Sequence, residues 1–327
     1  MRHLSLLAAA PLLALSPSPI HAAPRAPAVT PQAMMRHIEV LASDDYEGRK
    51  PGTAGETKTI RYIATQLGAL GLQGAAADGG WYQPVPLVER RPIANRASWR
   101  VNGAPVEIGQ DNLILVGKDA VERIENAPVW FVGSGTDAQL QGANLQGGIA
   151  LMLHDPARAA PERVAAVQKA GAVAVIIVYA DDVPWSAVTA PFKAGSTRLQ
   201  ARQVPEVQGA MPFAAASRLI PEQALAQAWS ESFRVIRTQA RGTLDVSSHV
   251  HAYTSHNVIG RLRGRGNTGE AVLYLGHWDH LGICAPQGAA DRICNGAVDN
   301  ASGIAMLIEI ARHVSRGERP QRDLLFM

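Results

Sequence analysis

One stretch near the end of the sequence limits the possible folds more than any other, because an apolar run, a helical pattern and a second apolar run follow one another. The first run, AVLYL at residues 271–275, reads as a strand from the middle of a sheet, and RDLLFM at residues 322–327 reads as the start of another strand. Between them, apolar residues recur on one helical face at Ile304, Leu307, Ile308 and Ala311. A strand, a helix and a second strand imply a right-handed crossover between parallel strands. The sequence therefore predicts an α/β fold with a mostly parallel sheet.

Changes in residue pattern divide the chain into four parts. Residues 1–22 combine a basic start, an apolar stretch too short to span a bilayer and a small-residue cleavage site, which predicts a cleaved secretory signal and a periplasmic or extracellular protein. Residues 23–103 open with two helical patterns, the first with Thr30 as N-cap and the second from about residue 57. Residues 104–245 read as a small α/β module with its own core, and residues 246–327 contain the strand–helix–strand run.

The composition and the distribution of charge argue against a nucleic-acid partner and against a membrane span. Hydrophobic residues make up 47% of the chain, which argues against disorder and provides enough apolar surface for real cores. The net charge is +3, and the basic residues are scattered singly or in pairs, whereas a nucleic-acid surface would cluster them. After the signal, no segment is long and apolar enough to cross a membrane. We therefore expect neither a nucleic-acid partner nor a membrane span.

Three motifs that point to other chemistry are rejected. Residues 264–269 match GxGxxG, but a strand follows where a dinucleotide site needs a helix, so we interpret the run as a glycine-rich hairpin turn. The GxSxG elbow of a serine hydrolase does not occur in the sequence. His249 and His251 would share one face of a strand, but only Asp245 is an acidic neighbour in the sequence, so we do not predict a metal site there.

A stronger pattern joins two segments of the last part. His277 and Asp279 follow the first apolar run and are two apart, so they point roughly the same way, and Asp279 can accept the imidazole N–H of His277. Asp299 comes just before the helix, for which Asn300 or Ser302 is the expected N-cap. A strand end and a helix start lie at the same rim of a parallel sheet, where ligands bind. A histidine, an orienting aspartate and a bridging aspartate predict part of a dinuclear metal site.

The loop after this strand contains the only two cysteines of the chain, Cys284 and Cys294. In an exported protein they are expected to form a disulfide that closes a loop of about ten residues, with two free thiols or two metal ligands as the alternatives. His280 is the extra imidazole of the first segment, and we expect it to hydrogen-bond within the loop and not to bind a metal.

Two of these segments resemble the M28 family of zinc metallopeptidases, aminopeptidase type: GHWDHLG at residues 276–282 resembles its His-x-Asp segment, and NGAVDNASG at residues 295–303 its bridging-aspartate segment. Residues 37–56 and 256–264 resemble its secreted bacterial members, and residues 104–245 resemble an inserted protease-associated (PA) domain. The resemblance implies a zinc-exopeptidase fold, two Zn²⁺ ions, and peptide or protein substrates cleaved at the N-terminal peptide bond. By position, His277 and Asp299 would bind zinc, and Asp279 would be the catalytic-site residue that orients His277.

The resemblance also implies residues that cannot be assigned in this sequence. The family has a Glu-Glu pair, an aspartate and a second histidine beyond the strand that RDLLFM begins, and Glu309, which lies in the helix, is no substitute. We therefore expect the chain to be a fragment without peptidase activity of its own. Two alternatives remain open: a non-catalytic, receptor-like protein that binds through its PA-like module, and a zinc enzyme of the same fold, such as a glutaminyl cyclase.

Overall fold

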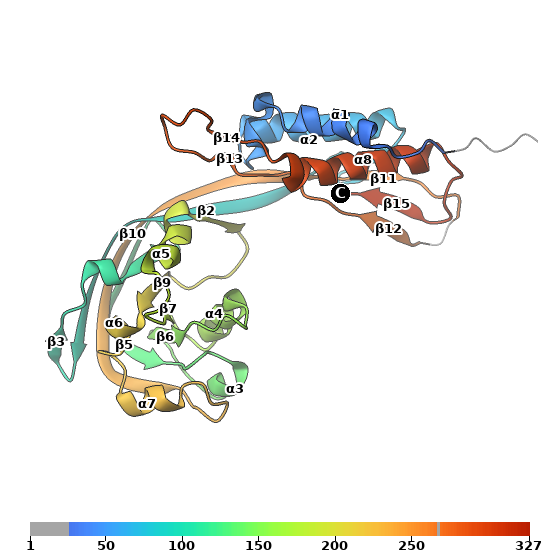
Figure 1. Cartoon of the computed structure of the whole chain (residues 1–327). Coiled ribbons are helices and arrows are strands. Elements are labelled where there is room, and N and C mark those ends of the chain that lie inside the picture. The colour runs from blue at the N-terminus through green and yellow to red at the C-terminus, as the bar shows by residue number, and fades with distance from the viewer. Residues whose placement is uncertain (1–25, 267–268) are drawn as a thin grey trace, which may run out of the picture. The chain divides into compact units, whose positions relative to one another are not determined.

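The computed structural model describes residues 26–266 and 269–327, so the predicted secretory signal at residues 1–22 lies outside the described residues. The described chain forms two compact units (Figure 1). The first unit combines the residues up to Gln83 with His256–Met327, and the second unit is Pro84–Ser255, which includes the module predicted for residues 104–245. Both units combine helices with sheets, so the predicted α/β class is confirmed.

The first unit begins with the helix that the sequence predicts. α1 (Pro31–Leu41) is capped by Thr30, whose side-chain oxygen accepts the Ala33 N–H at 3.2 Å, with Pro31 at the first helical position. The other elements of this unit are η1 (Asp44–Arg49), α2 (Ala54–Ala69), β1 (Gln73–Gly74), β11 (Gly260–Leu262), β12 (Ala271–Tyr274), β13 (Gly282–Ile283), β14 (Ile293–Cys294), η3 (Ala297–Ala301), α8 (Ser302–Ser315) and β15 (Asp323–Phe326).

The core of the first unit lies between its three long helices and its sheet. Figure 1 shows α1, α2 and α8 along one side of the strands, and α8 contacts both other helices. Leu67 of α2 and Ile308 of α8 are buried in one cluster with Phe326 of β15. This burial is what the apolar stripes of the helices predict, because residues three and four apart lie on one helical face.

The four-stranded sheet of the first unit has the order β1-β11-β15-β12, and it is mixed where the sequence predicts mostly parallel strands. β12 and β15 are parallel and are connected through α8, as the strand–helix–strand pattern predicts. β11 is antiparallel to both β1 and β15. The connections explain the difference: among the described elements, only α8 forms a crossover between consecutive strands of this sheet, and a parallel pair needs such a crossover.

Two further expectations about this sheet are wrong. β12 lies at the edge and not in the middle, and Leu273 is 52% exposed, because β15 is its one partner among the described strands. Residues 267 and 268 of the glycine-rich run lie outside the described residues, but the predicted hairpin pairing is wrong, since the strands on either side of the run, β11 and β12, both pair with β15 and not with each other. A strand does follow this run, so the context of a dinucleotide fingerprint is still not met.

The second unit is built on a nine-stranded sheet with the order β3-β2-β10-β5-β6-β7-β9-β4, and β8 pairs with β2. Its strands are β2 (Tyr82–Val101), β3 (Ala104–Val106), β4 (Ile114–Gly117), β5 (Val121–Phe131), β6 (Ile149–Leu153), β7 (Ala174–Tyr179), β8 (Ser196–Leu199), β9 (Val207–Pro212) and β10 (Ile236–Val258). Its helices are η2 (Gln110–Asn112), α3 (Asp137–Leu140), α4 (Ala160–Lys169), α5 (Trp185–Ala194), α6 (Phe213–Ala216) and α7 (Glu222–Gln227).

Alternating side chains give the parallel strands β5, β6, β7 and β9 two buried faces. On one face, residues such as Ile176 join a core that includes α6 and α7. On the other face, Val175 packs against Val167 of α4, and Ala210 packs against Val188 of α5. α4 and α5 therefore cover the same side of the sheet.

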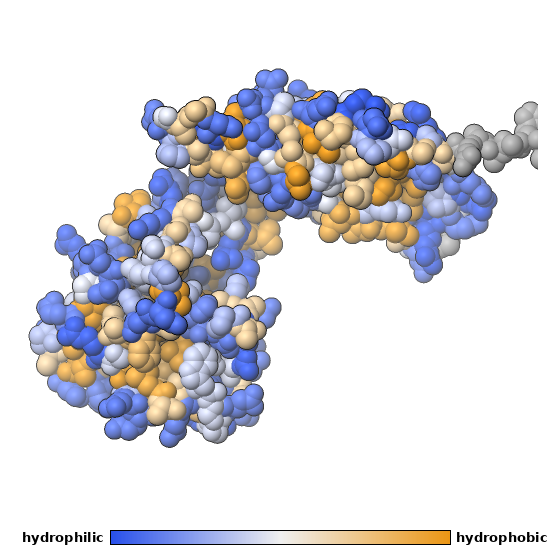
Figure 2. All heavy atoms as spheres, in the orientation of Figure 1, coloured by the Kyte–Doolittle hydropathy of each residue, from blue (hydrophilic) through white to orange (hydrophobic). Residues whose placement is uncertain are grey.

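The surface is mostly polar with apolar residues among the polar ones. Figure 2 shows hydrophilic residues over much of the visible face of each unit, with apolar side chains exposed between them. None of the helices in the described part of the chain has the length and apolar character needed to cross a bilayer.

Candidate metal-binding site

The segment after β12 alternates between the core and the surface. Trp278 is 9% exposed, and its Nε1–H donates to the His256 carbonyl at 3.1 Å. In an extended chain, neighbouring side chains point to opposite sides, and residues two apart share a side. Burial of Trp278 therefore directs His277 and Asp279, whose side chains are 57% and 46% exposed, to the surface side.

Asp299 lies in a tight turn, η3, that leads directly into α8. Gly296 opens the turn at a φ of +61°, and its carbonyl accepts the Ala301 N–H at 3.1 Å. A Cβ atom at this position would lie 2.3 Å from the Asp299 carbonyl oxygen, so both the conformation and the close approach require glycine. The turn holds the Asp299 side chain exposed at the start of α8.

The predicted N-cap of α8 is wrong, because neither candidate side chain accepts a backbone N–H. Asn300 Nδ2 donates to the His277 carbonyl at 3.0 Å, and Ser302 Oγ donates to the Val298 carbonyl at 2.7 Å. Both side chains thus act as donors, whereas a capping oxygen is an acceptor. The Asn300 bond connects the segment of Asp299 directly to the segment of His277.

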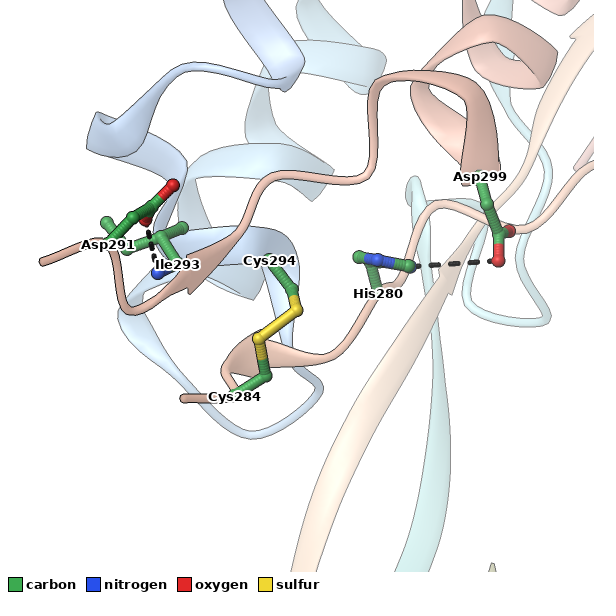
Figure 3. Close-up of a disulfide and its surroundings, with 6 residues drawn as sticks. All are labelled: His280, Cys284, Asp291, Ile293, Cys294 and Asp299. Carbon is green, nitrogen blue, oxygen red and sulfur yellow. Dashed lines mark hydrogen bonds and ion pairs between the residues drawn. A yellow bond between two sulfur atoms is a disulfide. The ribbon is translucent and has the colours of Figure 1, made fainter. Parts of the chain in front are cut away.

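The two segments bring the three predicted side chains together. His277 Nε2 lies 3.3 Å from Asp299 Oδ1, and His277 Nδ1 lies 3.3 Å from Asp279 Oδ1. His280 Nδ1 lies 3.8 Å from the other Asp299 oxygen, Oδ2, and Figure 3 shows these two side chains facing each other. The Asp299 carboxylate therefore lies between two imidazoles, with one oxygen toward each.

The atoms of this site fit a zinc ion in kind and in spacing. A proton on His277 Nδ1, donated to Asp279, leaves the lone pair on Nε2 facing Asp299. A tetrahedral ion with bonds of about 2.0–2.2 Å holds two ligand atoms roughly 3.3–3.6 Å apart, and the observed separation is 3.3 Å. Within the part of the chain that the structure describes, no group of three or more His, Cys, Asp or Glu is arranged to hold a metal. The site thus offers His277 and Asp299 as a ligand pair, with Asp279 behind His277.

Comparison with known families agrees with this chemistry. Residues 257–327 match the model of peptidase family M28. This stretch, named the M28 segment below, contains His277, Asp279 and Asp299. None of the curated proteins compared with the chain matches it.

Several solved structures are similar to this chain over most of its length. An aminopeptidase from Aneurinibacillus sp. is 22% identical, with 90% of this chain and 61% of that chain covered and a TM-score of 0.47. A zinc aminopeptidase from Bacillus subtilis is 21% identical, with 90% and 60% covered and a TM-score of 0.39. A peptidase M28 precursor from Shewanella amazonensis is 16% identical, with 90% and 65% covered and a TM-score of 0.41. The chain spans between 60% and 65% of the length of these three proteins.

Sequence reasoning missed one residue that supports the M28 segment, Arg49 of η1. Arg49 is 0% exposed, and its guanidinium donates to the carbonyls of Trp278 at 2.9 Å, Asn295 at 2.6 Å and Gly296 at 2.8 Å. A further bond, to the Leu41 carbonyl at 2.5 Å, anchors it to the end of α1. Arg49 therefore joins the backbone of both segments that contain the predicted ligands.

The electrostatics of Arg49 reflect this position. Burial lowers the pKa of its guanidinium, and the nearby carboxylates of Asp279 and Asp299 act in the opposite direction. The sequence gives little sign of this role, because a single arginine in the polar loop of residues 41–56 reads as a surface residue. The one sign of this role in the sequence is the glycine beside Arg49, Gly48. In the structure the φ of Gly48 is +65°, and a Cβ atom there would lie 2.4 Å from the Cys294 carbonyl oxygen, so this position requires glycine.

Cys284 and Cys294 form a disulfide beside this site, with their Cα atoms 5.8 Å apart (Figure 3). Cys294 lies on β14, and β13 and β14 pair antiparallel, with Gly282 opposite Cys294. The disulfide thus closes the loop between the two short strands.

Replacing both cysteines with serine is expected to lower the free energy of unfolding of the first unit by about 2–3 kcal/mol, because the open chain gains the entropy of a free loop of about ten residues. Urea unfolding followed by circular dichroism measures the change. Adding a reductant to the unchanged chain should produce the same loss. A difference below about 0.5 kcal/mol, which is typical of neutral surface substitutions, would contradict this prediction.

Glu309 belongs to α8 and is separate from the candidate metal site. It is 2% exposed, its Oε2 accepts from Arg312 Nε at 2.9 Å, and its Oε1 lies 3.4 Å from His37 Nε2. Burial acts to raise the pKa of this carboxyl, but the hydrogen bonds and charges of Arg312 and His37 outweigh it, so the pKa is lowered. Burial also lowers the pKa of His37.

The lowered pKa values of Glu309 and His37 both predict that the free energy of unfolding decreases as the pH falls. A carboxyl with a lowered pKa stabilises the fold above its unfolded value of 4.5, and this contribution disappears as the pH falls through the folded pKa. Glu309→Gln is expected to cost about 3 kcal/mol at neutral pH and to make stability less dependent on pH below about pH 5. Urea unfolding at several pH values tests this, with the exposed Glu318→Gln as control. Equal pH dependence in Glu309→Gln and the unchanged chain would contradict it.

Proposed function

We propose that this chain forms part of a zinc-dependent metalloexopeptidase of the aminopeptidase type, which hydrolyses the N-terminal peptide bond of peptides or proteins. The observation that carries the proposal is the meeting of His277, Asp279 and Asp299 within the M28 segment, with His277 Nε2 3.3 Å from Asp299 Oδ1. We also propose that the complete site holds two zinc ions bridged by Asp299. The Asp299 carboxylate is exposed and has two oxygens, of which only Oδ1 faces His277, so Oδ2 is available to bind a second ion, which supports a bridging role.

In this proposal, His277 and Asp299 bind zinc and Asp279 orients His277. Zinc, when bound, supplies a Lewis acid that polarises the substrate carbonyl and activates water. Asp279 keeps the proton on His277 Nδ1, so that the Nε2 lone pair stays available for binding. The buried Trp278 fixes the direction in which both of its neighbours point.

The domain organisation is part of the same proposal. Residues 23–103 and 246–327 contribute to the peptidase domain, and residues 104–245 form a PA-like insert. The second unit, Pro84–Ser255, lies in the sequence between the two parts of the first unit, which supports an insertion. Residues 1–22 are proposed to be a secretory signal that directs the protein to the periplasm or the exterior.

Asp279→Asn tests the orienting role separately from the ligand role. It is expected to lower the affinity of the chain for zinc by about 10–100-fold without unfolding it, because loss of such a hydrogen-bond partner typically has this effect. Isothermal titration with zinc measures the affinity. Asp245→Asn, in the second unit and paired with Arg123, is the matched control. An affinity equal to that of this control would show that Asp279 does not orient His277.

The reaction itself is tested with the whole protein that the natural gene encodes, of which this chain is proposed to be a part. We expect release of the N-terminal residue from short peptides, loss of this activity with a chelator, its return with added zinc, and its absence in the His277→Ala variant. Zinc binding at His277 without any release from a panel of peptides would overturn the peptidase proposal and favour a non-catalytic binding protein.

A further inference from the structure

The second unit contains a pocket of about 200 Å³ on the face of its sheet that α4 and α5 cover. Val116 of β4, Ile177 of β7 and Gln208 of β9 form its floor, because they alternate along their strands with residues of the opposite core. α4 borders one side, α5 borders another through Phe192, and residues 196–205 complete the wall.

The wall of this pocket carries three arginines, Arg90, Arg198 and Arg202, and none of the described residues that line it is Asp or Glu. Arg90 is held in place by its Nε–H, which donates to the Lys118 carbonyl at 2.7 Å. Burial lowers the pKa of Arg198, and repulsion by Arg202 lowers it further. The excess positive charge is therefore concentrated and partly shielded from water.

Two of these guanidinium groups are available to a ligand. Among residues 26–266 and 269–327, the side chains of Arg198 and Arg202 have no hydrogen-bond or ion-pair partner. A guanidinium presents paired N–H donors that match the two oxygens of a carboxylate. The remainder of the lining is largely apolar, with Val164, Ile177 and Phe192 facing the same space. The pocket thus combines an anion-binding wall with room for an apolar group.

We propose that this pocket binds the free C-terminal carboxylate and the apolar last side chain of a peptide. The arginines would bind the carboxylate, and the apolar residues would surround the side chain. Gln168, Gln203 and Gln208 also line the pocket, and their amides can bond the peptide group that precedes the carboxylate. A free amino acid fits less well, because its ammonium group would lie among arginines with no acidic side chain in the lining. A fatty acid would leave the three glutamines beside an alkyl chain.

Titration calorimetry on the whole chain tests the proposal, with a chelator present so that the candidate zinc site does not contribute. The probes are N-acetyl-L-leucine, its uncharged amide, free leucine, acetate and octanoate. We expect N-acetyl-L-leucine to bind best, and its amide to bind at least about tenfold more weakly, since a charge-assisted bond is roughly twice as strong as a neutral one. Arg198→Gln and Arg202→Gln should each weaken binding of N-acetyl-L-leucine by about tenfold or more.

Arg123→Gln is the matched control, since Arg123 is an exposed arginine of the same unit that pairs with Glu125. It should leave binding unchanged, and thermal unfolding should show that all three variants remain folded. Equal binding of the amide, equal binding of acetate, or tighter binding of octanoate or free leucine would overturn the assignment to a peptide C-terminus. Unchanged binding in a double Arg198→Gln, Arg202→Gln variant, or no binding by the unchanged chain, would overturn it as well.

Discussion

Replacing His277 with alanine is expected to lower the affinity of the chain for zinc by more than about a hundredfold, since loss of even a hydrogen-bond partner of a ligand costs about 10–100-fold. Its Nε2 atom is one of two ligand atoms, 3.3 Å from Asp299 Oδ1, so little remains to hold the ion. Asp299→Asn is expected to lower the affinity as strongly, because it removes the negative charge that binds zinc. The substitution keeps the shape of the side chain, so the fold should not change. Competition for zinc against a chromophoric chelator measures both affinities.

Variants of two other histidines show whether the effect on zinc affinity is specific to the ligand His277. His251→Ala is the matched control, since this imidazole lies on β10, stacked on Tyr253 and outside the M28 segment, and its loss should leave zinc binding unchanged. His280→Ala is expected to reduce zinc affinity by less than about tenfold, because His280 contacts Asp299 without being a predicted ligand. If His277→Ala binds zinc as tightly as His251→Ala, the candidate site is not where zinc binds.

The parts of the fold that local patterns specify could be predicted from the sequence. Thr30 and Pro31 mark the start of α1, because the capping oxygen and the fixed proline φ act within one turn. The parallel pair of β12 and β15 followed from the crossover rule. The same rule places a strand end and a helix start at one rim, which explains why His277 and Asp299 could be expected to meet.

The parts that depend on distant partners could not be predicted. AVLYL has the same apolar pattern whether it has one neighbouring strand or two, so the sequence does not reveal that it lies at the edge of the sheet formed by the described strands. Asn300 is a good N-cap by type, but its amide donates to the His277 carbonyl, which lies in another segment. The burial of Arg49 likewise depends on carbonyls contributed by the loops around Trp278 and Gly296. In each case a long-range contact replaces the outcome that local preference favours.

Arg49→Lys is expected to have the second large effect, on both stability and zinc binding. Lysine keeps the charge but lacks the planar fork that reaches the carbonyls of Trp278, Asn295 and Gly296 together. Leaving buried carbonyls without their donor costs about 1–3 kcal/mol each, so the free energy of unfolding of the first unit should fall by several kcal/mol. Because the same bonds align the segments of His277 and Asp299, zinc affinity in the folded variant should fall by about tenfold or more.

A second buried arginine distinguishes this positioning role from a general loss of stability. Arg163 of α4 is 6% exposed and donates to the carbonyls of Ser134 at 2.6 Å and Leu153 at 2.9 Å, in the second unit. Arg163→Lys removes the same kind of bond and should destabilise the second unit, but its zinc affinity should equal that of the unchanged chain. Zinc titration at a temperature where both variants are folded compares them. If Arg49→Lys binds zinc as tightly as Arg163→Lys, then Arg49 stabilises the fold without positioning the ligands, because the alignment of His277 with Asp299 would survive the loss of its bonds.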